Sequence, residues 1–86
     1  MAPTPTTNLE DTMLVAYMVL KGHKIKPWRD KESPDHITFD IEGDAAKIEA
    51  DMQTYYANEQ VGIADFIRCF KAVKSQMYAM KKVAAV

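Results

Sequence analysis

The residues HITFDIEGD, numbered 36–44, set the architecture of the chain. Their apolar members alternate with polar ones, and this period of two predicts a β-strand with one buried and one exposed face. Gly43 then breaks the pattern, and Asp44 is a residue type that caps helix N-termini. We therefore expect a strand over 36–42 and a helix directly after it.

A partner strand is predicted upstream, over residues 23–29. The connecting residues 30–35, DKESPD, are rich in turn formers, so the two strands are expected to form an antiparallel hairpin. Pro27 cannot donate a backbone hydrogen bond to a ladder, which places the first strand at an edge or a bulge. Because an isolated hairpin is marginally stable, we expect helices to cover one of its faces.

Three helices complete the prediction: one from residue 7 or 8 to about 21, one from 44 to about 58, and one over 61–82. The class is therefore α+β, in the order α-β-β-α-α, with a short antiparallel hairpin and the helices packed on one face of it. We expect residues 8–82 to form a single small domain. Residues 1–7 are predicted to be a disordered tail, and residues 83–86 to fray.

The first predicted helix is apolar on every side. It takes Thr7 or Asn8 as its cap and ends before Gly22, a residue that favours the position after a helix end. A helix that is apolar all round is covered all round. Either this helix is central in the domain, or Leu14 and Met18 face a second copy of the chain.

Charge is segregated along the 86 residues, although the net charge is only −1. Residues 21–31 hold five cations against one anion, residues 32–59 hold eight carboxylates against one lysine, and residues 60–86 again hold five cations against one anion. A bipolar molecule of this kind is expected to associate with itself or to present a basic face to an acidic partner.

Cysteine content and hydropathy predict the compartment. The one cysteine, Cys69, excludes an internal disulfide, which favours a reducing environment. The longest apolar run has eight residues, far fewer than the roughly 20 of a membrane span, and the N-terminus has no basic leader. We expect a soluble, cytoplasmic protein that does not enter a membrane.

Few residues suggest catalysis or metal binding. One cysteine and two histidines cannot supply the four ligands of a structural zinc. Pairing Arg29 with His36 across the hairpin puts His23 opposite Glu42, too far from His36 to share a metal. Cys69 is expected to be half-buried, and the helix residues Glu49 and Asp51 to be solvated. We predict no enzyme, no metal and no cofactor.

The strand GHKIKPWRDK, residues 22–31, carries the candidate binding residues. Lys24, Lys26 and Trp28 share one face of an extended strand, a pattern typical of single-stranded nucleic-acid binding through phosphate contacts and base stacking. Arg29 and Lys31 extend the basic character. Against this interpretation, carboxylates of the facing strand reduce the charge, and lysines on an edge strand also guard against aggregation.

Three segments resemble a group of short phage- and bacterium-encoded proteins classed as a domain of unknown function: TMLVAYMVLKGHKI, ITFDIEGD and FIRCFKAVKSQMYAMK. The shared features are Gly22-His23, Phe39, and Lys74 with Tyr78, and the resemblance covers roughly residues 8–81. It implies a small accessory protein, viral and located in the host cytoplasm, with no catalytic residues.

The sequence thus predicts a small non-enzymatic interaction module, a homodimer that acts as a phage accessory or host-modulating protein. Self-association is expected through Leu14 and Met18 of the first helix or through the free edge of the hairpin, and a host protein is a further candidate partner. The alternatives left open are a single-stranded nucleic-acid-binding protein that uses Lys24, Lys26, Trp28, Arg29 and Lys31, and a small-molecule binder with a pocket between subunits.

Overall fold

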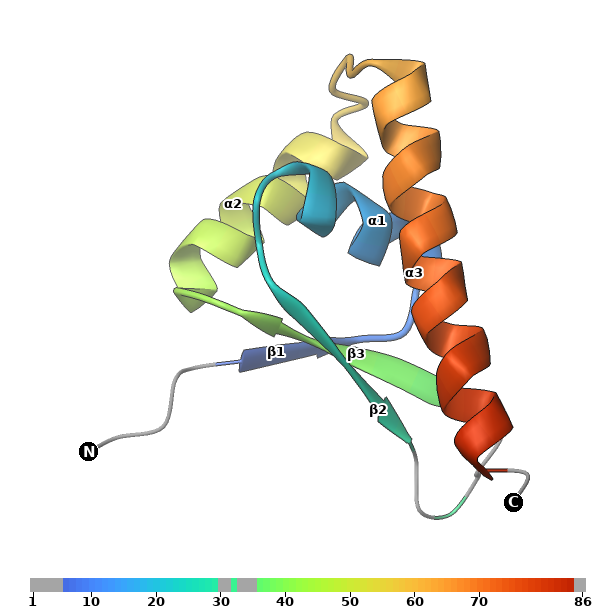
Figure 1. The fold of residues 1–86 in the computed structure, drawn as a ribbon. Helices are drawn as coiled ribbons and strands as arrows, with labels where there is room; N and C mark the ends of the chain where they lie inside the picture. Colours follow the sequence, from blue (N-terminus) through green and yellow to red (C-terminus); the bar gives the residue numbers. More distant parts are fainter. Residues whose placement is uncertain (1–5, 30–31, 33–35, 85–86) are drawn as a thin grey trace.

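The α+β class is confirmed in a computed structural model, which describes residues 6–29, 32 and 36–84 (Figure 1). The predicted hairpin and three helices are present, together with one additional strand at the N-terminus. The elements are β1 (Thr6–Leu9), α1 (Thr12–Leu20), β2 (Ile25–Arg29), β3 (Ile37–Glu42), α2 (Ala45–Tyr56) and α3 (Ile63–Ala84).

The three strands form an antiparallel sheet in the order β1-β3-β2, so the strand with the clearest alternation lies in the centre. The predicted register of the hairpin is wrong by one residue, because Arg29 lies opposite Ile37. The observed register puts Ile25 opposite Ile41, with both on the face that meets the helices. Burial of one face specifies the register, since a slip by one residue would expose the apolar set.

Pro27 lies on an edge strand, as predicted. The backbone N–H of Glu42 donates to the carbonyl of Lys24, so the backbone groups of alternate residues from Lys24 onward point toward β3. The Pro27 nitrogen therefore faces the free edge, and β3 loses no hydrogen bond to it.

The N-terminal strand β1 corrects the predicted start of the first helix. Thr6–Leu9 pairs with β3, and the side-chain amide of Asn8 donates to Thr38 Oγ1 and Asp40 Oδ1, both at 2.9 Å. Thr6 and Thr7, which the predicted tail included, therefore belong to the sheet. Residues 1–5 of that tail lie outside the described residues.

Asp11 caps α1 in place of Thr7 or Asn8. Its Oδ1 atom accepts from the backbone N–H groups of Met13 at 3.0 Å and Leu14 at 3.3 Å. At the other terminus of the chain, α3 includes residues 83 and 84, which were predicted to fray, and residues 85–86 lie outside the described residues.

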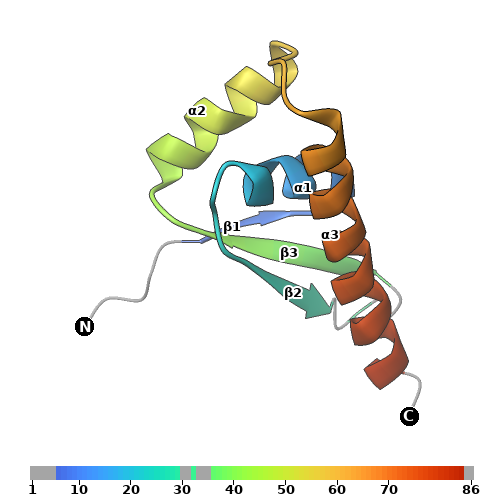
Figure 2. The same ribbon diagram turned by 45° about the horizontal axis from the view of Figure 1, so that its top comes forward.

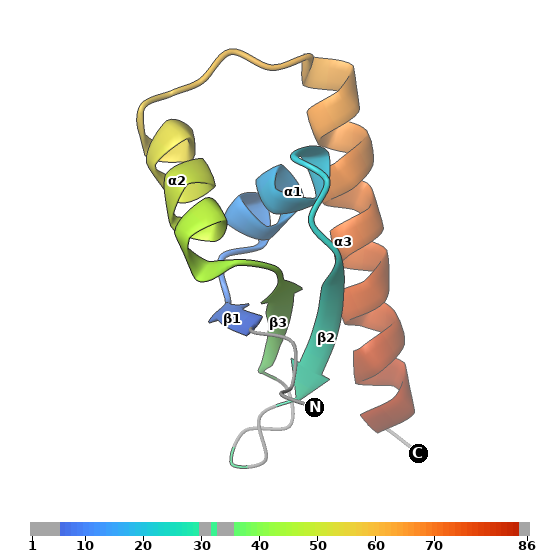
Figure 3. The ribbon, with the colours of Figure 1, turned by 90° about the vertical axis from the view of Figure 1, so that its left-hand side faces the viewer.

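Helix α1 is the centre of the molecule. It lies over one face of the sheet, between α2 and α3 (Figures 2 and 3). Five consecutive residues of α1 are buried, with Leu14 2% and Met18 0% exposed. The second-copy interpretation of these two residues is therefore wrong, and the central position explains why α1 is apolar all round. The other buried apolar residues are Ile37, Phe39, Ile41, Ile48 and Val73.

Among the described residues, no helix combines the length and apolarity that crossing a membrane requires.

Candidate functional site: a polar network and a hollow between the helices

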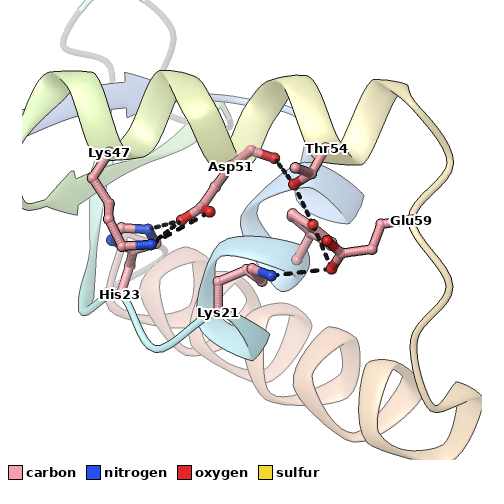
Figure 4. A network of polar contacts seen from close by, with 7 residues as sticks. Lys21, His23, Lys47, Asp51, Thr54 and Glu59 are labelled. Carbon is pink, nitrogen blue, oxygen red and sulfur yellow. Dashed lines mark hydrogen bonds and ion pairs between the residues drawn. The ribbon is translucent and has the colours of Figure 1, made fainter.

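The site lies between the C-terminal ends of α1 and α2, which end in the same type of turn. Gly22 (φ +95°) follows α1 and Asn58 (φ +64°) follows α2, and each lies in the left-handed conformation of a Schellman motif. The closing bonds run from His23 N–H to the Met18 carbonyl at 3.0 Å and from Glu59 N–H to the Thr54 carbonyl at 3.1 Å. The first motif directs His23 toward α2, and the second directs Glu59 toward α1 (Figure 4).

His23 and Asp51 form a buried pair. Nε2 of His23 lies 2.6 Å from Oδ2 of Asp51, and each side chain is 8% exposed. Lys47 lies one helical turn before Asp51 and approaches the same oxygen at 3.3 Å. Burial acts to raise the pKa of Asp51, but the hydrogen bonds from His23 and Lys47 outweigh it and hold the pKa below its ordinary value. The ionised carboxylate only accepts, so Nε2 of His23 carries the proton.

A second group of contacts joins α1 to the end of α2. The Tyr17 hydroxyl lies 2.6 Å from Thr54 Oγ1 and donates to Glu59 Oε1 at 2.9 Å. The Lys21 ammonium donates to the same Glu59 oxygen at 3.1 Å. The hydrogen bonds from Lys21 and Tyr17 lower the pKa of Glu59, and the bond to Glu59 raises the pKa of Lys21.

A hollow of about 130 Å³ lies beside this second group. Its walls come from α1, the end of α2, the connection 57–62 and the first turns of α3. Three of the six lining residues are aromatic and one, Glu59, carries a carboxylate. The lining residues are Tyr17, Tyr55, Asn58, Glu59, Val61 and Phe66. Burial, followed by Asp11 and Tyr56, raises the pKa of the Tyr55 hydroxyl.

The basic strand is placed largely as predicted. Lys24, Lys26 and Trp28 are all exposed on the outer face of the sheet, with Trp28 50% exposed. The same face carries Asp40 opposite Lys26, so the local charge is mixed.

Arg29 does not belong to that surface. Its side chain is partly buried, and Nη2 donates to the Met80 carbonyl of α3 at 3.0 Å. The Nε atom is buried with no hydrogen-bond partner among the described residues. The side chain of Arg29 therefore connects β2 to α3. This contact corrects the prediction that Arg29 binds nucleic acid. Lys31 lies outside the described residues.

Four exposed apolar residues belong to the end of α2, the connection 57–62 and the first turns of α3. Tyr56 is 69%, Val61 38%, Ile63 75% and Ile67 43% exposed, and we call these four residues the α2–α3 apolar surface. Ile63 and Ile67 lie four residues apart on α3 and so share one of its faces, whereas Val73, further along the helix, is fully buried. Phe66 in the same turns packs against the core, so within one chain it is Ile63 and Ile67 that are left exposed.

Among the described residues, His23 hydrogen-bonds to the Asp51 carboxylate rather than to a hydroxyl or thiol, and Cys69 is half-buried. Within the described part of the chain, no group of three or more His, Cys, Asp or Glu residues has the arrangement of a metal site. The His23–Asp51 pair connects elements of the fold.

Sequence reasoning missed Asp51 and Glu59. Asp51 was predicted to be solvated, yet it lies three residues after buried Ile48 and four before Tyr55, on the inner stripe of α2. That spacing was the signal that could have identified it. Glu59 directly follows Asn58, and the left-handed turn at Asn58 is what returns the chain toward α1.

No family model, curated protein or solved structure matches this chain. The resemblance to short phage and bacterial proteins, with the accessory role and host compartment that it implies, therefore stays a prediction.

Proposed function

We propose that the chain is a non-enzymatic interaction module that associates with a second copy of itself through the α2–α3 apolar surface. The observation that carries this proposal is the exposure of four large apolar side chains at one end of the molecule. Apolar clusters of this kind on small domains mark interaction sites, since leaving them in water is unfavourable.

Charge favours a second copy as the occupant. The segment 44–59, with α2, holds four carboxylates against Lys47, of which Asp51 and Glu59 are paired within the chain. Helix α3 holds five cations against Asp65. Exposed members include Glu49 on α2 and Lys71 on α3. The apolar surface lies between these two helices, so a copy related by a two-fold axis can place its basic α3 on the acidic α2 of the other, twice.

Sedimentation velocity over a wide concentration range tests this proposal. The wild type is expected to shift from monomer to dimer as concentration rises. Ile63→Glu is expected to weaken the dimer by at least about tenfold in Kd, because it puts a charge into the centre of an apolar contact. Ile63 is 75% exposed, so the folded monomer has room for the substitution.

Met13→Glu is the matched control. Met13 is 53% exposed but belongs to α1 rather than to α2, the connection 57–62 or α3, and its substitution should leave the dimer unchanged. A wild type that stays monomeric at the highest concentration would contradict the proposal, as would equal weakening by both substitutions.

A second candidate function, single-stranded nucleic-acid binding, is supported by the shared exposure of Lys24, Lys26 and Trp28 on one face. Two ammonium groups and an indole fit a phosphate backbone and a stacked base. The expected outcome is retardation of an oligonucleotide at low salt, with quenching of Trp28 fluorescence and weaker binding by Lys26→Glu. Absence of retardation at low salt rules this function out.

A further inference from the structure

We propose that the hollow between the helices binds an alkylammonium head group. Tyr17, Tyr55 and Phe66 supply aromatic walls and Glu59 supplies a carboxylate, all around one volume of about 130 Å³. This inference does not rest on self-association, although Val61 belongs to both the hollow and the α2–α3 apolar surface.

Aromatic rings combined with a carboxylate are the groups that bind organic cations. Aromatic rings attract a cation through the negative charge of their faces, and cages of rings are the usual means of recognising quaternary ammonium groups. Tyr17 and Tyr55 have ring centroids 5.3 Å apart with 60° between their planes, so together they form a corner. Glu59 adds a full negative charge, which disfavours anionic ligands.

The chain's own Lys21 already demonstrates this chemistry. Its Nζ atom lies 5.7 Å from the centroid of the Tyr17 ring and 3.1 Å from Glu59 Oε1. An ammonium group therefore contacts one of the rings and the carboxylate of the site. Because Lys21 uses the same two partners, it competes with any cation that enters.

The neighbouring donors keep the Glu59 carboxylate ionised near neutral pH. The Lys21 ammonium and the Tyr17 hydroxyl hold the pKa of Glu59 below its ordinary value. Tyr17 and Lys21 both donate to Oε1, and neither donates to Oε2 in the structure. A bound cation can thus approach the carboxylate without displacing the Tyr17 hydroxyl.

Size limits the ligand to a head group. Pockets for whole drug-sized ligands span about 300–1,000 Å³, well above the volume of this hollow. Two sources offer the same chemistry: a free quaternary ammonium compound, or the methylated lysine side chain of a partner protein.

The test is an NMR titration of the wild-type chain with three probes: tetramethylammonium chloride, a trimethyllysine peptide, and the same peptide with unmodified lysine. Sodium chloride at equal ionic strength is the reference. Ring signals of Tyr17, Tyr55 and Phe66 are expected to shift with a quaternary probe. Tighter binding of the trimethyllysine peptide assigns a protein side chain, tighter binding of tetramethylammonium assigns a free cation, and no shift with either overturns the proposal.

Two variants distinguish binding in the hollow from nonspecific binding of cations elsewhere on the chain. Glu59→Gln is expected to weaken binding by about tenfold or more, since it removes the charge while keeping an acceptor for Tyr17. Lys21→Met is expected to strengthen binding, because it removes the competing ammonium. If Glu59→Gln binds as tightly as the wild type, or Lys21→Met binds more weakly, the proposal is wrong.

Tyr78→Leu is the matched control. Lys74 lies over the rings of Phe70 and Tyr78 at 5.4 and 5.8 Å, a cation–aromatic contact outside the hollow. Loss of Tyr78 should leave the titration unchanged. Binding should also persist in Ile63→Glu, and this result distinguishes failure of the ligand site from failure of self-association.

Discussion

At the scale of single residues, Asp51 holds α2 in place. Helix α2 has one fully buried apolar side chain, Ile48, and the buried carboxylate of Asp51 is its other inward anchor. The carboxylate receives His23 from the α1–β2 connection and Lys47 from its own helix. Composition predicted a solvated carboxylate here, because the sequence does not reveal that His23 arrives from 28 residues away.

Asp51→Ala is expected to destabilise the protein by about 2 kcal/mol, since His23 is left buried without its partner. Glu49→Ala, on the exposed side of the same helix, should change the stability by less than about 0.5 kcal/mol. Urea unfolding measures both. Equal effects of the two substitutions would mean that the buried pair contributes nothing.

The lowered pKa of Asp51 also predicts how the stability of the fold changes at acidic pH. The pKa of Asp51 is lower in the folded chain than in the unfolded chain, so its contribution is complete above the unfolded value of about 3.9 and is lost as pH falls through the folded value. The difference in thermal stability between wild type and Asp51→Ala should therefore shrink as pH falls below about 4. A difference that stays constant down to strongly acidic pH contradicts this assignment.

At the scale of elements, signals carried by neighbouring residues predicted the structure well. The strand β3, the cap Asp44 and the helix stop at Gly22 follow from adjacent residues, and all three are confirmed. The strand β1 escaped prediction because it has four residues and pairs with residues of β3 that lie 30 or more positions away. In the same way, the sequence of α3 could not show that Ile63 stays exposed while Phe66 packs against the core.

Gly22→Ala tests the Schellman motif that directs His23 toward α2. No atom lies within 4 Å of the added Cβ, so the expected loss of about 1–2 kcal/mol comes from the positive φ alone. Asn58→Gly, at the equivalent position of α2, should be close to neutral, because glycine adopts this conformation readily. Thermal unfolding compares the two, and a stable Gly22→Ala protein would show that the turn is not a constraint.

At the scale of the whole molecule, folding separates the acidic and basic segments of the sequence in space. The acidic segment that contains α2 and the basic helix α3 lie on opposite sides of α1, with the α2–α3 apolar surface where they are connected (Figure 3). Charge segregation was visible in the sequence, and self-association was predicted from it. The residues then assigned to it, Leu14 and Met18, are core residues, because apolarity alone does not distinguish a central helix from an exposed one.

The most direct measurement of self-association is an isotope-filtered NOE experiment on a mixture of labelled and unlabelled chains. It detects only contacts between copies. Intermolecular NOEs are expected from the methyl groups of Ile63 and Ile67 to the α2 residues of the other copy. Absence of intermolecular NOEs at high concentration, or NOEs confined to the outer face of the sheet around Trp28, would contradict this expectation.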